Sequence, residues 1–214
     1  MPLGCRIVGT YLIDISIGSP IHHLFSPSNF FKDIVVLKFN EKCIMELTKW
    51  LHDRTGAYDW THASAAAVEL EGKRDQIQEK EMRIKASIKQ ILKCDFGQEN
   101  LTSPVVLPLA DCVMSGIILD AISKNEDEYM INLEKIIKLI KPGGKLLLLG
   151  LLDVTYITVG GERVHRMKYN EDFVKNALCK LGLVIDYCAV QRRRNVSDLT
   201  DYKAIIFIAA CKGE

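Results

Sequence analysis

The chain has 214 residues, 48% of them hydrophobic, which is enough to bury the core of one α/β domain or at most two small ones. Lysine and arginine total 28 against 27 acidic residues, and this net charge of +1 favours neither nucleic acid nor an acidic membrane as a partner. The longest apolar stretch, Leu146 to Leu152, is too short to span a bilayer, and Met1 to Gly9 lacks the apolar core of a signal peptide.

The seven cysteines are an odd number, and no two of them have C-x-x-C spacing. A zinc site is therefore not expected. Most of the cysteines lie inside apolar runs, so reduced, buried thiols are the simplest interpretation. We expect the protein to be cytoplasmic and monomeric.

The first half of the chain alternates predicted strands and helices. Strands are predicted at residues 10–15, 33–39 and 88–94, and helices at 20–25, 41–52 and 74–86. The last of these helices is highly charged, with Ile77 and Ile84 on one stripe, and we interpret it as a solvated helix and not as a nucleic-acid patch. Residues 54–60 and 97–109 are predicted loops.

The second half begins with a predicted strand at residues 110–115 and an amphipathic helix at 127–140. Lys141-Pro142-Gly143-Gly144 ends this helix, because proline cannot extend it and glycine permits the turn. A buried parallel strand at 145–152 follows. The remaining predictions are a hairpin around Gly160-Gly161, an Asn-capped helix at 170–181, and strands at 183–190 and 202–210.

This alternation predicts an α/β fold with an open, mainly parallel sheet and helices on both faces. No helix separates the last two strands, so we expect them to pair antiparallel at one edge. In such sheets a ligand lies beyond the carboxyl ends of the strands. Four strand ends qualify: Asp14 to Pro20, Lys38 to Asn40, Asp95-Phe96 and Ser115-Gly116.

Asp95-Phe96 allows two readings. An acid and an aromatic residue at a strand end suit an adenine, whose exocyclic amine donates to the carboxylate. A strand-end Asp that caps its own turn is an equally good explanation.

Several motifs together resemble the nicotinamide, indolethylamine and phenylethanolamine N-methyltransferase family, within the class I S-adenosylmethionine-dependent methyltransferases. The resemblance runs from about Leu12 to Lys212. The segments that carry it are Glu46 to Trp60 (ELTKWLHDRTGAYDW), Glu69 to Gly72 (ELEG), Leu92 to Asp95 (LKCD), Leu107 to Val113 (LPLADCV) and Ile140 to Leu149 (IKPGGKLLLL).

The resemblance implies a Rossmann-like domain over residues 1–214 with a seven-stranded sheet, and S-adenosyl-L-methionine as cofactor. A neutral nitrogen of a small amine or pyridine would attack the sulfonium methyl in line. The protein would mostly position the reactants, with the reacting atoms about 3–3.5 Å apart. No metal and no covalent enzyme intermediate are needed.

The resemblance also places the cofactor at ten positions of this chain. They are Asp14, Ser16, Gly18, His22, Lys38, Phe39, Cys43, Asp95, Phe96 and Gly116.

Several of these positions depart from the family pattern. Ser16 replaces the first glycine of the turn after the first strand, where Asp14 and Gly18 are kept, and its side chain crowds the methionine part of the cofactor. Lys38 replaces the acid that holds both ribose hydroxyls, and a lysine can only donate. A tyrosine, an asparagine and a threonine of the family fall on His22, Cys43 and Gly116.

The substrate positions depart further. The family carboxylate at the end of the fifth strand falls on Gly150, and a serine in the hairpin region falls on Arg166. Asp153 either compensates for the missing acid or is an ordinary surface residue. The family also has a helical segment with tyrosines before the first strand, where this chain offers about ten residues, so we expect that lid to be absent.

Other candidate features have ordinary explanations. His22 and His23 are adjacent and point apart, so a shared metal is not expected. Arg192 to Arg194 is interpreted as a solvated loop instead of a phosphate patch. Trp50, Tyr58 and Trp60 are expected to pack a helix end against a loop, although such aromatics can also stack a ligand.

Two functions from different classes remain. The first is an N-methyltransferase with a weakened cofactor grip, and the second is a non-catalytic or truncated relative that acts, if at all, by binding. A nucleotide-binding oxidoreductase is a third reading that Lys38 would suit through a 2′-phosphate, but the turn lacks G-x-G-x-x-G.

Overall fold

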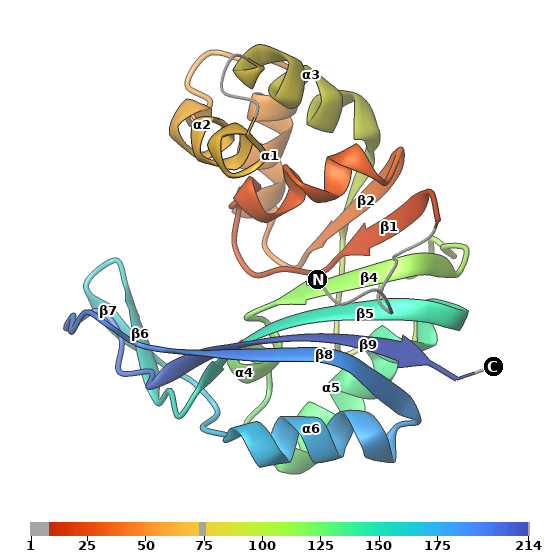
Figure 1. The fold of residues 1–214 in the computed structure, drawn as a ribbon, viewed down its shortest axis with the longest axis vertical. Helices are drawn as coiled ribbons and strands as arrows, with labels where there is room; N and C mark the ends of the chain where they lie inside the picture. The colour runs from red at the N-terminus through yellow and green to blue at the C-terminus, as the bar shows by residue number, and fades with distance from the viewer. Residues whose placement is uncertain (1–8, 73–75, 214) are drawn as a thin grey trace. The chain divides into compact units, whose positions relative to one another are not determined.

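The computed structural model describes residues 9–72 and 76–213, which form two compact units (Figure 1). We call residues 9–106 the N-terminal unit and residues 107–213 the C-terminal unit. The expectation about a lid segment before the first strand lies outside the described residues, as do Cys5 and the predicted helix start at Arg74.

Three parallel strands form the sheet of the N-terminal unit. They are β1 (Tyr11–Asp14), β2 (Asp33–Lys38) and β3 (Ile88–Lys93), in the order β3-β2-β1. The strands β1 and β2 are almost continuously buried, as expected for parallel strands covered on both faces. All three were predicted from the sequence to within one or two residues.

The helices of this unit are η1 (His22–Leu24), η2 (Pro27–Asn29), α1 (Glu41–Leu51), α2 (Thr61–Leu70) and α3 (Ile77–Ser87). The side chain of Asn40 caps α1 by accepting from the N–H of Lys42 at 2.8 Å. The sequence prediction missed α2. This helix is rich in alanine and buries only Ser64 and Val68, so it has no apolar stripe to reveal it.

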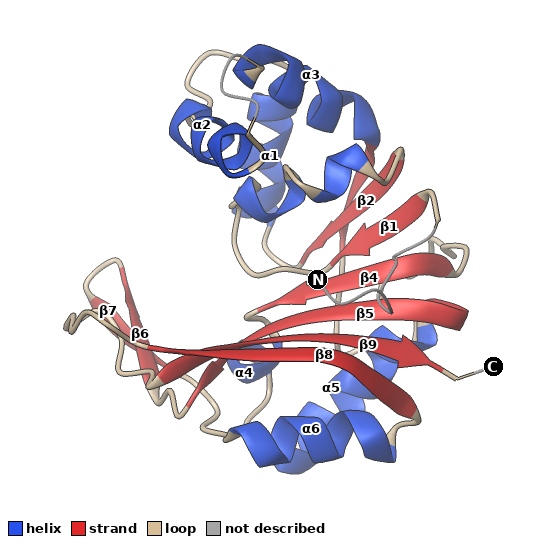
Figure 2. Cartoon of the chain, in the orientation of Figure 1, coloured by secondary structure: helices blue, strands red, loops and turns tan. Residues whose placement is uncertain are grey.

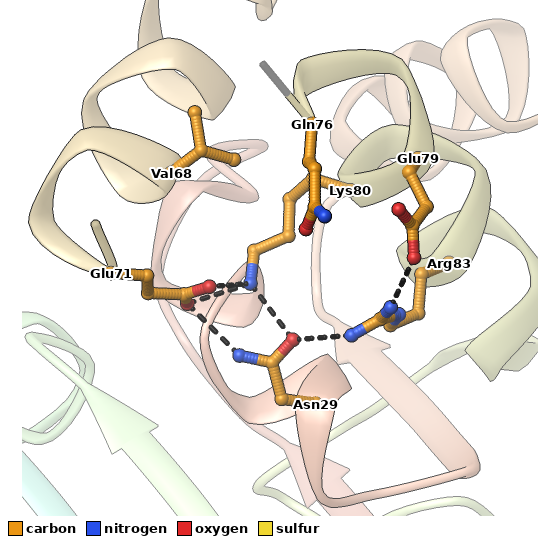
Figure 3. Close-up of a pocket in the computed structure, with 7 residues that line it drawn as sticks. All are labelled: Asn29, Val68, Glu71, Gln76, Glu79, Lys80 and Arg83. Carbon is orange, nitrogen blue, oxygen red and sulfur yellow. Dashed lines mark hydrogen bonds and ion pairs between the residues drawn. The ribbon is translucent and has the colours of Figure 1, made fainter. Parts of the chain in front are cut away.

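An ionic cluster ties α2, α3 and η2 together (Figure 3). The ammonium of Lys80 donates to both carboxylate oxygens of Glu71, at 2.6 and 2.7 Å, and to Asn29 Oδ1 at 2.9 Å. Arg83 Nη1 donates to the same Asn29 oxygen. The cavity at this place is only about 10 Å³, room for about one water molecule. Glu71 of the E-L-E-G motif therefore has a structural role.

The C-terminal unit contains four strands in the order β4-β5-β9-β8: β4 (Ala110–Gly116), β5 (Ile140–Leu152), β8 (Leu183–Arg192) and β9 (Ala204–Lys212). The pair β4 and β5 is parallel, whereas β9 runs antiparallel to both β5 and β8. The predicted antiparallel pairing of the last two strands is confirmed.

The Lys-Pro-Gly-Gly segment differs from the prediction. It lies inside β5, which begins at Ile140, and the preceding helix ends earlier, at Lys138. Gly143 has a φ of +73°. A Cβ on Gly144 would lie 2.7 Å from Ile140 Cγ2 and 2.9 Å from the Lys141 carbonyl oxygen, so only glycine fits there.

The other elements of this unit are α4 (Leu119–Ile122), α5 (Glu126–Lys138), β6 (Tyr156–Val159), β7 (Glu162–His165) and α6 (Glu171–Lys180), as Figure 2 shows. The helix α5 packs on β4 and β5, and α6 packs on β8. The predicted hairpin is confirmed, with positive φ at both Gly160 and Gly161. So is the Asn170 cap, which accepts from the N–H of Phe173 at 2.8 Å.

The thiols are less buried than expected. Six cysteines of the described chain are free, and of these Cys94 and Cys112 are buried while Cys179 is exposed. In the part of the chain that the structure describes, no helix has both the length and the hydrophobicity to cross a membrane.

Candidate functional site

The turn after β1 is organised around a fully buried carboxylate, that of Asp14. The Ser16 hydroxyl donates to Asp14 Oδ1 at 2.6 Å, and His23 Nε2 lies 3.0 Å from the same oxygen. Lys38 Nζ, from the end of β2, lies 3.4 Å from Oδ2. The structure thus brings together three predicted cofactor positions and adds His23.

The side chain of Lys38 points into the N-terminal unit, with only 2% of it exposed. Besides its contact with Asp14, its ammonium donates to the Ser16 carbonyl oxygen at 2.6 Å. Lysine is a donor only, and here its donors serve acceptors of the chain itself. Donation from Lys38 to a ribose hydroxyl stays a prediction, and it would require the side chain to leave these partners.

The electrostatics keep Asp14 ionised. Burial alone would raise the pKa of its carboxyl group, but the charges of His23 and Lys38 and hydrogen bonds from His23 and Ser16 hold that pKa well below the ordinary value. Burial, together with the charges of His23 and His62, lowers the pKa of the neighbouring His22. Within residues 9–72 and 76–213, no group of His, Cys, Asp and Glu side chains is arranged to hold a metal ion.

Gly18 is the glycine of this turn that the chain retains. Its φ is +71°, and a Cβ there would lie 3.1 Å from Pro20 Cδ. A side chain would therefore be strained in both conformation and space. The turn keeps its glycine where the backbone needs one.

At the end of β3, the carboxylate of Asp95 caps its own turn and is exposed to solvent. Its Oδ1 accepts from the N–H of Gly97 at 2.8 Å, and Oδ2 takes no part in that hydrogen bond. Asp95 is exposed and lines a cavity of about 330 Å³ with Lys93, Cys94, Gln98, Leu101 and Ser103. Phe96 is the next residue, and it also interacts with another part of the protein. Both readings of Asp95 are therefore compatible with the geometry.

The other predicted cofactor positions are more dispersed. Phe39 follows β2 with 41% of its surface exposed, and the free thiol of Cys43 lies half-buried on α1. A thiol is a weak hydrogen-bonding group and does not replace an asparagine in kind. Gly116 is the last residue of β4 and belongs to the C-terminal unit, whereas the other nine positions belong to the N-terminal unit.

At the substrate position Gly150, another residue of the C-terminal unit occupies the space that a side chain would need. A Cβ on Gly150 would lie 2.1 Å from the hydroxyl oxygen of Tyr169, far inside van der Waals contact. Tyr169 is almost fully buried, which raises the pKa of its hydroxyl, and that hydroxyl also interacts with the Leu151 backbone. The space of a side chain at position 150 is therefore taken by a tyrosine.

The other substrate position, Arg166, is buried beside the carboxylate of Asp120. Arg166 Nη1 and Asp120 Oδ2 are 3.7 Å apart, too long for a hydrogen bond. Burial raises the pKa of Asp120 to about 6, although the Arg166 charge opposes this, and burial lowers the pKa of Arg166. The pair attracts by charge without a hydrogen bond between these atoms.

Asp153 lies at the surface. Its side chain is 40% exposed, and its carboxylate is 3.9 Å from the ammonium of Lys168. This geometry matches the reading of Asp153 as a surface residue.

The remaining sequence candidates have packing roles. The Arg193 guanidinium donates to the carbonyl oxygens of Asn195, Ser197 and Thr200 and so holds its own loop together. Trp50 is buried under the Lys85 ammonium, while the rings of Tyr58 and Trp60 contact each other at 4.7 Å.

Sequence reasoning missed two residues of the C-terminal unit, Asp120 and Tyr169, and considered His23 of the N-terminal unit only as a metal ligand. The signal for Asp120 was present, since it is the one acid in the apolar run Ile117 to Ile122 and lies just after β4. A buried acid in such a place needs a partner. No local sequence pattern predicts the contact of Tyr169 with Gly150.

The cofactor predicted from the sequence, S-adenosyl-L-methionine, fits the residues present in part. Asp95 has an exposed carboxylate that can meet an adenine amine, Phe39 is partly exposed for stacking, and the Gly18 turn is kept. The ribose end fits less well, because Lys38 is turned inward.

Comparisons with solved structures identify the fold. The chain matches a methyltransferase from Methanosarcina mazei, described as SAM-dependent, with a TM-score of 0.65 and 13% identity, covering 98% of this chain and 94% of the other. It matches the N-methyltransferase NodS of Bradyrhizobium japonicum, solved with S-adenosyl-L-homocysteine, with a TM-score of 0.56 and 12% identity, covering 97% and 80%. The predicted Rossmann-like methyltransferase fold is confirmed, and the expected cofactor is the one on which the Methanosarcina mazei protein is described as dependent.

Sequence comparisons identify the family. The chain is 32% identical to nicotinamide N-methyltransferase of Homo sapiens, covering 96% of this chain and 78% of the relative, and 33% identical to indolethylamine N-methyltransferase of Oryctolagus cuniculus, covering 95% and 78%. It is 35% identical to phenylethanolamine N-methyltransferase of Mus musculus, covering 98% and 72%. The model of the NNMT/PNMT/TEMT family matches residues 3–213. The chain therefore belongs to the NNMT/PNMT/TEMT family.

Proposed function

We propose that this protein is an S-adenosylmethionine-dependent N-methyltransferase of a small amine or a pyridine-type nitrogen. The observation that carries the proposal is the family match over nearly the whole chain, with relatives named for nicotinamide, indolethylamine and phenylethanolamine. We also propose that residues 1–214 act as a single methyltransferase-like domain. The cytoplasmic location, the monomeric state and the absence of a nucleic-acid partner stay predictions.

When bound, the cofactor would supply an electrophilic methyl group to the lone pair of the acceptor nitrogen, and its sulfur would keep the electrons of the C–S bond that breaks. The chain's part is positioning. Asp95 would hold the adenine amine, Phe39 would cover the ring, and the Gly18 turn would let the backbone approach the cofactor closely.

A weakened grip on the cofactor belongs to the same proposal. An acid at the end of β2 could accept from two ribose hydroxyls, whereas Lys38 is already bonded to Ser16 and lies beside Asp14. Freeing Lys38 would leave the buried carboxylate of Asp14 without its charged neighbour, which is unfavourable. We therefore expect weak binding of the ribose.

The second candidate is a non-catalytic relative that acts by binding. The observation in its favour is again Lys38, whose pairing with Asp14 satisfies the turn without any ligand. The two candidates differ in one measurable property, the transfer of a methyl group.

The test is a methyl-transfer assay with isotopically labelled S-adenosylmethionine at millimolar concentration, with a panel of small amines and pyridines as acceptors. Methylated product that Asp95→Ala abolishes and Asp198→Ala retains would support the enzyme, since Asp198 is an exposed loop residue. The absence of product from every acceptor, at saturating cofactor, would favour the non-catalytic relative.

A further inference from the structure

Arg166 and Asp120 form a buried charged pair whose hydrogen-bonding groups are not satisfied. Their side chains are only 6% and 1% exposed. Arg166 Nε and Nη1 and Asp120 Oδ2 have no hydrogen-bond partner among the described residues. Buried polar groups in native proteins are nearly always hydrogen-bonded, so such a group calls for an explanation.

The backbone around the pair is well ordered by hydrogen bonds. The N–H of Arg166 donates to the Thr155 carbonyl oxygen at 2.9 Å, and the N–H of Met167 donates to the Asp120 carbonyl oxygen at 2.9 Å. The segment after β7 is thereby fixed against α4. Only the side-chain ends of the two residues lack partners, so the unsatisfied groups do not come from a loose loop.

The substitutions at the substrate positions change the local charge in one direction. The sequence resemblance places an acid and a serine at the positions of Gly150 and Arg166. Loss of the acid and gain of the guanidinium together make these positions two charges more positive. Tyr169 fills the space beside Gly150, so an acid cannot be accommodated there in this conformation. Relative to an acid and a serine, this change favours an anionic group on the ligand over an ammonium, and the Asp120 carboxylate beside Arg166 offsets part of it.

We propose that Arg166 binds a carboxylate on the methyl acceptor, so that the acceptor is a nitrogen compound carrying an acid group, such as a pyridine carboxylate or an aromatic amino acid. The inference rests on the proposed function and names its substrate class. Arginine is well suited to carboxylates because its guanidinium presents several donors in one plane.

Arg166 can meet a carboxylate at little cost in hydrogen bonds. Arg166 keeps a slight exposure, and turning its guanidinium toward a carboxylate breaks no hydrogen bond from Nε or Nη1. Asp120 holds the guanidinium nearby through its charge. The free Oδ2 atom of Asp120 can accept from an N–H or O–H donor of the same ligand.

The experiment compares matched acceptors that differ in the acid group: pyridine-3-carboxylate against pyridine-3-carboxamide, and phenylalanine against 2-phenylethylamine. We expect the carboxylate member of at least one pair to have a kcat/KM higher by about tenfold or more, since charge-assisted hydrogen bonds are the strong ones. Arg166→Ser should remove that preference. Arg163→Ser is the matched control, because Arg163 is exposed on β7 and stacks on Tyr156.

Equal or faster methylation of both neutral members by the unaltered protein would overturn the inference and leave the proposed function intact. This comparison needs no variant, so it stands even if Arg166→Ser does not fold. If no acceptor is methylated although the cofactor binds, the proposed function fails, and ligand-observed NMR with the same four compounds decides the inference alone. Selective binding of a carboxylate member supports it, and binding of neither carboxylate overturns it.

Discussion

The ammonium of Lys38, at the end of β2, donates to the carbonyl oxygen of Ser16, in the turn after β1, at a distance of 2.6 Å. The same ammonium lies 3.4 Å from the buried carboxylate of Asp14. Lys38 therefore supports from inside the unit the turn that is expected to meet the cofactor. The residue that the sequence resemblance places at the ribose position has a structural role here.

Removing this ammonium should destabilise the protein. In Lys38→Met the carboxylate of Asp14 keeps only Ser16 and His23, and loss of one partner from a buried pair typically costs about 3–5 kcal/mol. Denaturant unfolding would measure the loss. The control is Lys32→Met, at an exposed position, which should change the free energy of unfolding by less than about 0.5 kcal/mol. A Lys38→Met protein as stable as the control would contradict the assigned role.

Restoring the family acid should not by itself repair the site. Lys38→Asp would place a second buried carboxylate near Asp14, and like charges at such a site repel. We expect a protein less stable than Lys38→Met and no gain in cofactor affinity. Tighter binding of S-adenosylhomocysteine by Lys38→Asp, measured by calorimetry at equal folded fraction, would show that the turn accommodates the acid after all.

The contact of Gly150 with Tyr169 predicts that a second substitution restores stability lost by the first. Gly150→Ala forces its new methyl group against the Tyr169 hydroxyl and should cost about 1–3 kcal/mol, the usual range for overpacking. Tyr169→Phe removes the hydroxyl and leaves the nearest ring carbon 3.3 Å away. The double variant should therefore be more stable than the sum of the two single changes predicts. Strict additivity in thermal or denaturant unfolding would mean that the two positions do not touch.

Asp120 predicts an unusual pH dependence. Its folded pKa, about 6, lies above the ordinary value of 3.8, so between these values the folded protein binds more protons than the unfolded chain. The contribution of this group to stability is present at low pH and is lost as the pH rises through about 6, by about 3 kcal/mol in total. The pH dependence that Asp14 contributes to stability has the opposite sign. Its pKa is lowered, so its stabilisation is lost in acid.

The check is unfolding between pH 4 and pH 7 in the unaltered protein and in Asp120→Asn. The unaltered protein should lose stability across this range relative to the variant, which has no charge to bury. Parallel stability curves for the two proteins would show that Asp120 does not titrate there.

The ionic cluster around Glu71 predicts that the stability of α2 and α3 depends on Lys80. Lys80→Met leaves the Glu71 carboxylate without its cation and should cost about 3 kcal/mol or more. Glu79→Gln breaks only the exposed pair with Arg83 and should cost about 0.5 kcal/mol or less. Hydrogen exchange in α2 and α3 would locate the effect. Equal losses in the two variants would argue against a special role for the buried pair.

Much of the fold could be predicted from local patterns. The strands, the Asn170 cap and the Gly160-Gly161 turn each have a short signal, and the structure confirms them. The helix α2 was missed because its alanines carry no amphipathic stripe. The first glycine of Lys-Pro-Gly-Gly marks a turn, but the pattern does not reveal that β5 begins before it.

The site was harder to predict, because its chemistry depends on contacts between distant residues. The sequence shows that Lys38 follows a strand, but not that its side chain turns inward to Ser16. It shows a glycine at position 150, but not that Tyr169 fills the space beside it. Such pairings are set by how the elements pack, which single-residue propensities do not encode.

Under the proposed function, the methyltransferase scaffold holds its cofactor weakly, because Lys38 bonds to the turn instead of to the ribose. Calorimetric titration of the unaltered protein with S-adenosylhomocysteine and S-adenosylmethionine tests it most directly. Loss of two hydrogen bonds to a carboxylate, each worth about 1.5–3 kcal/mol, weakens binding by about 100-fold or more, which turns a low-micromolar dissociation constant into one of about 100 μM or weaker. Low-micromolar dissociation constants for either compound would contradict the claim.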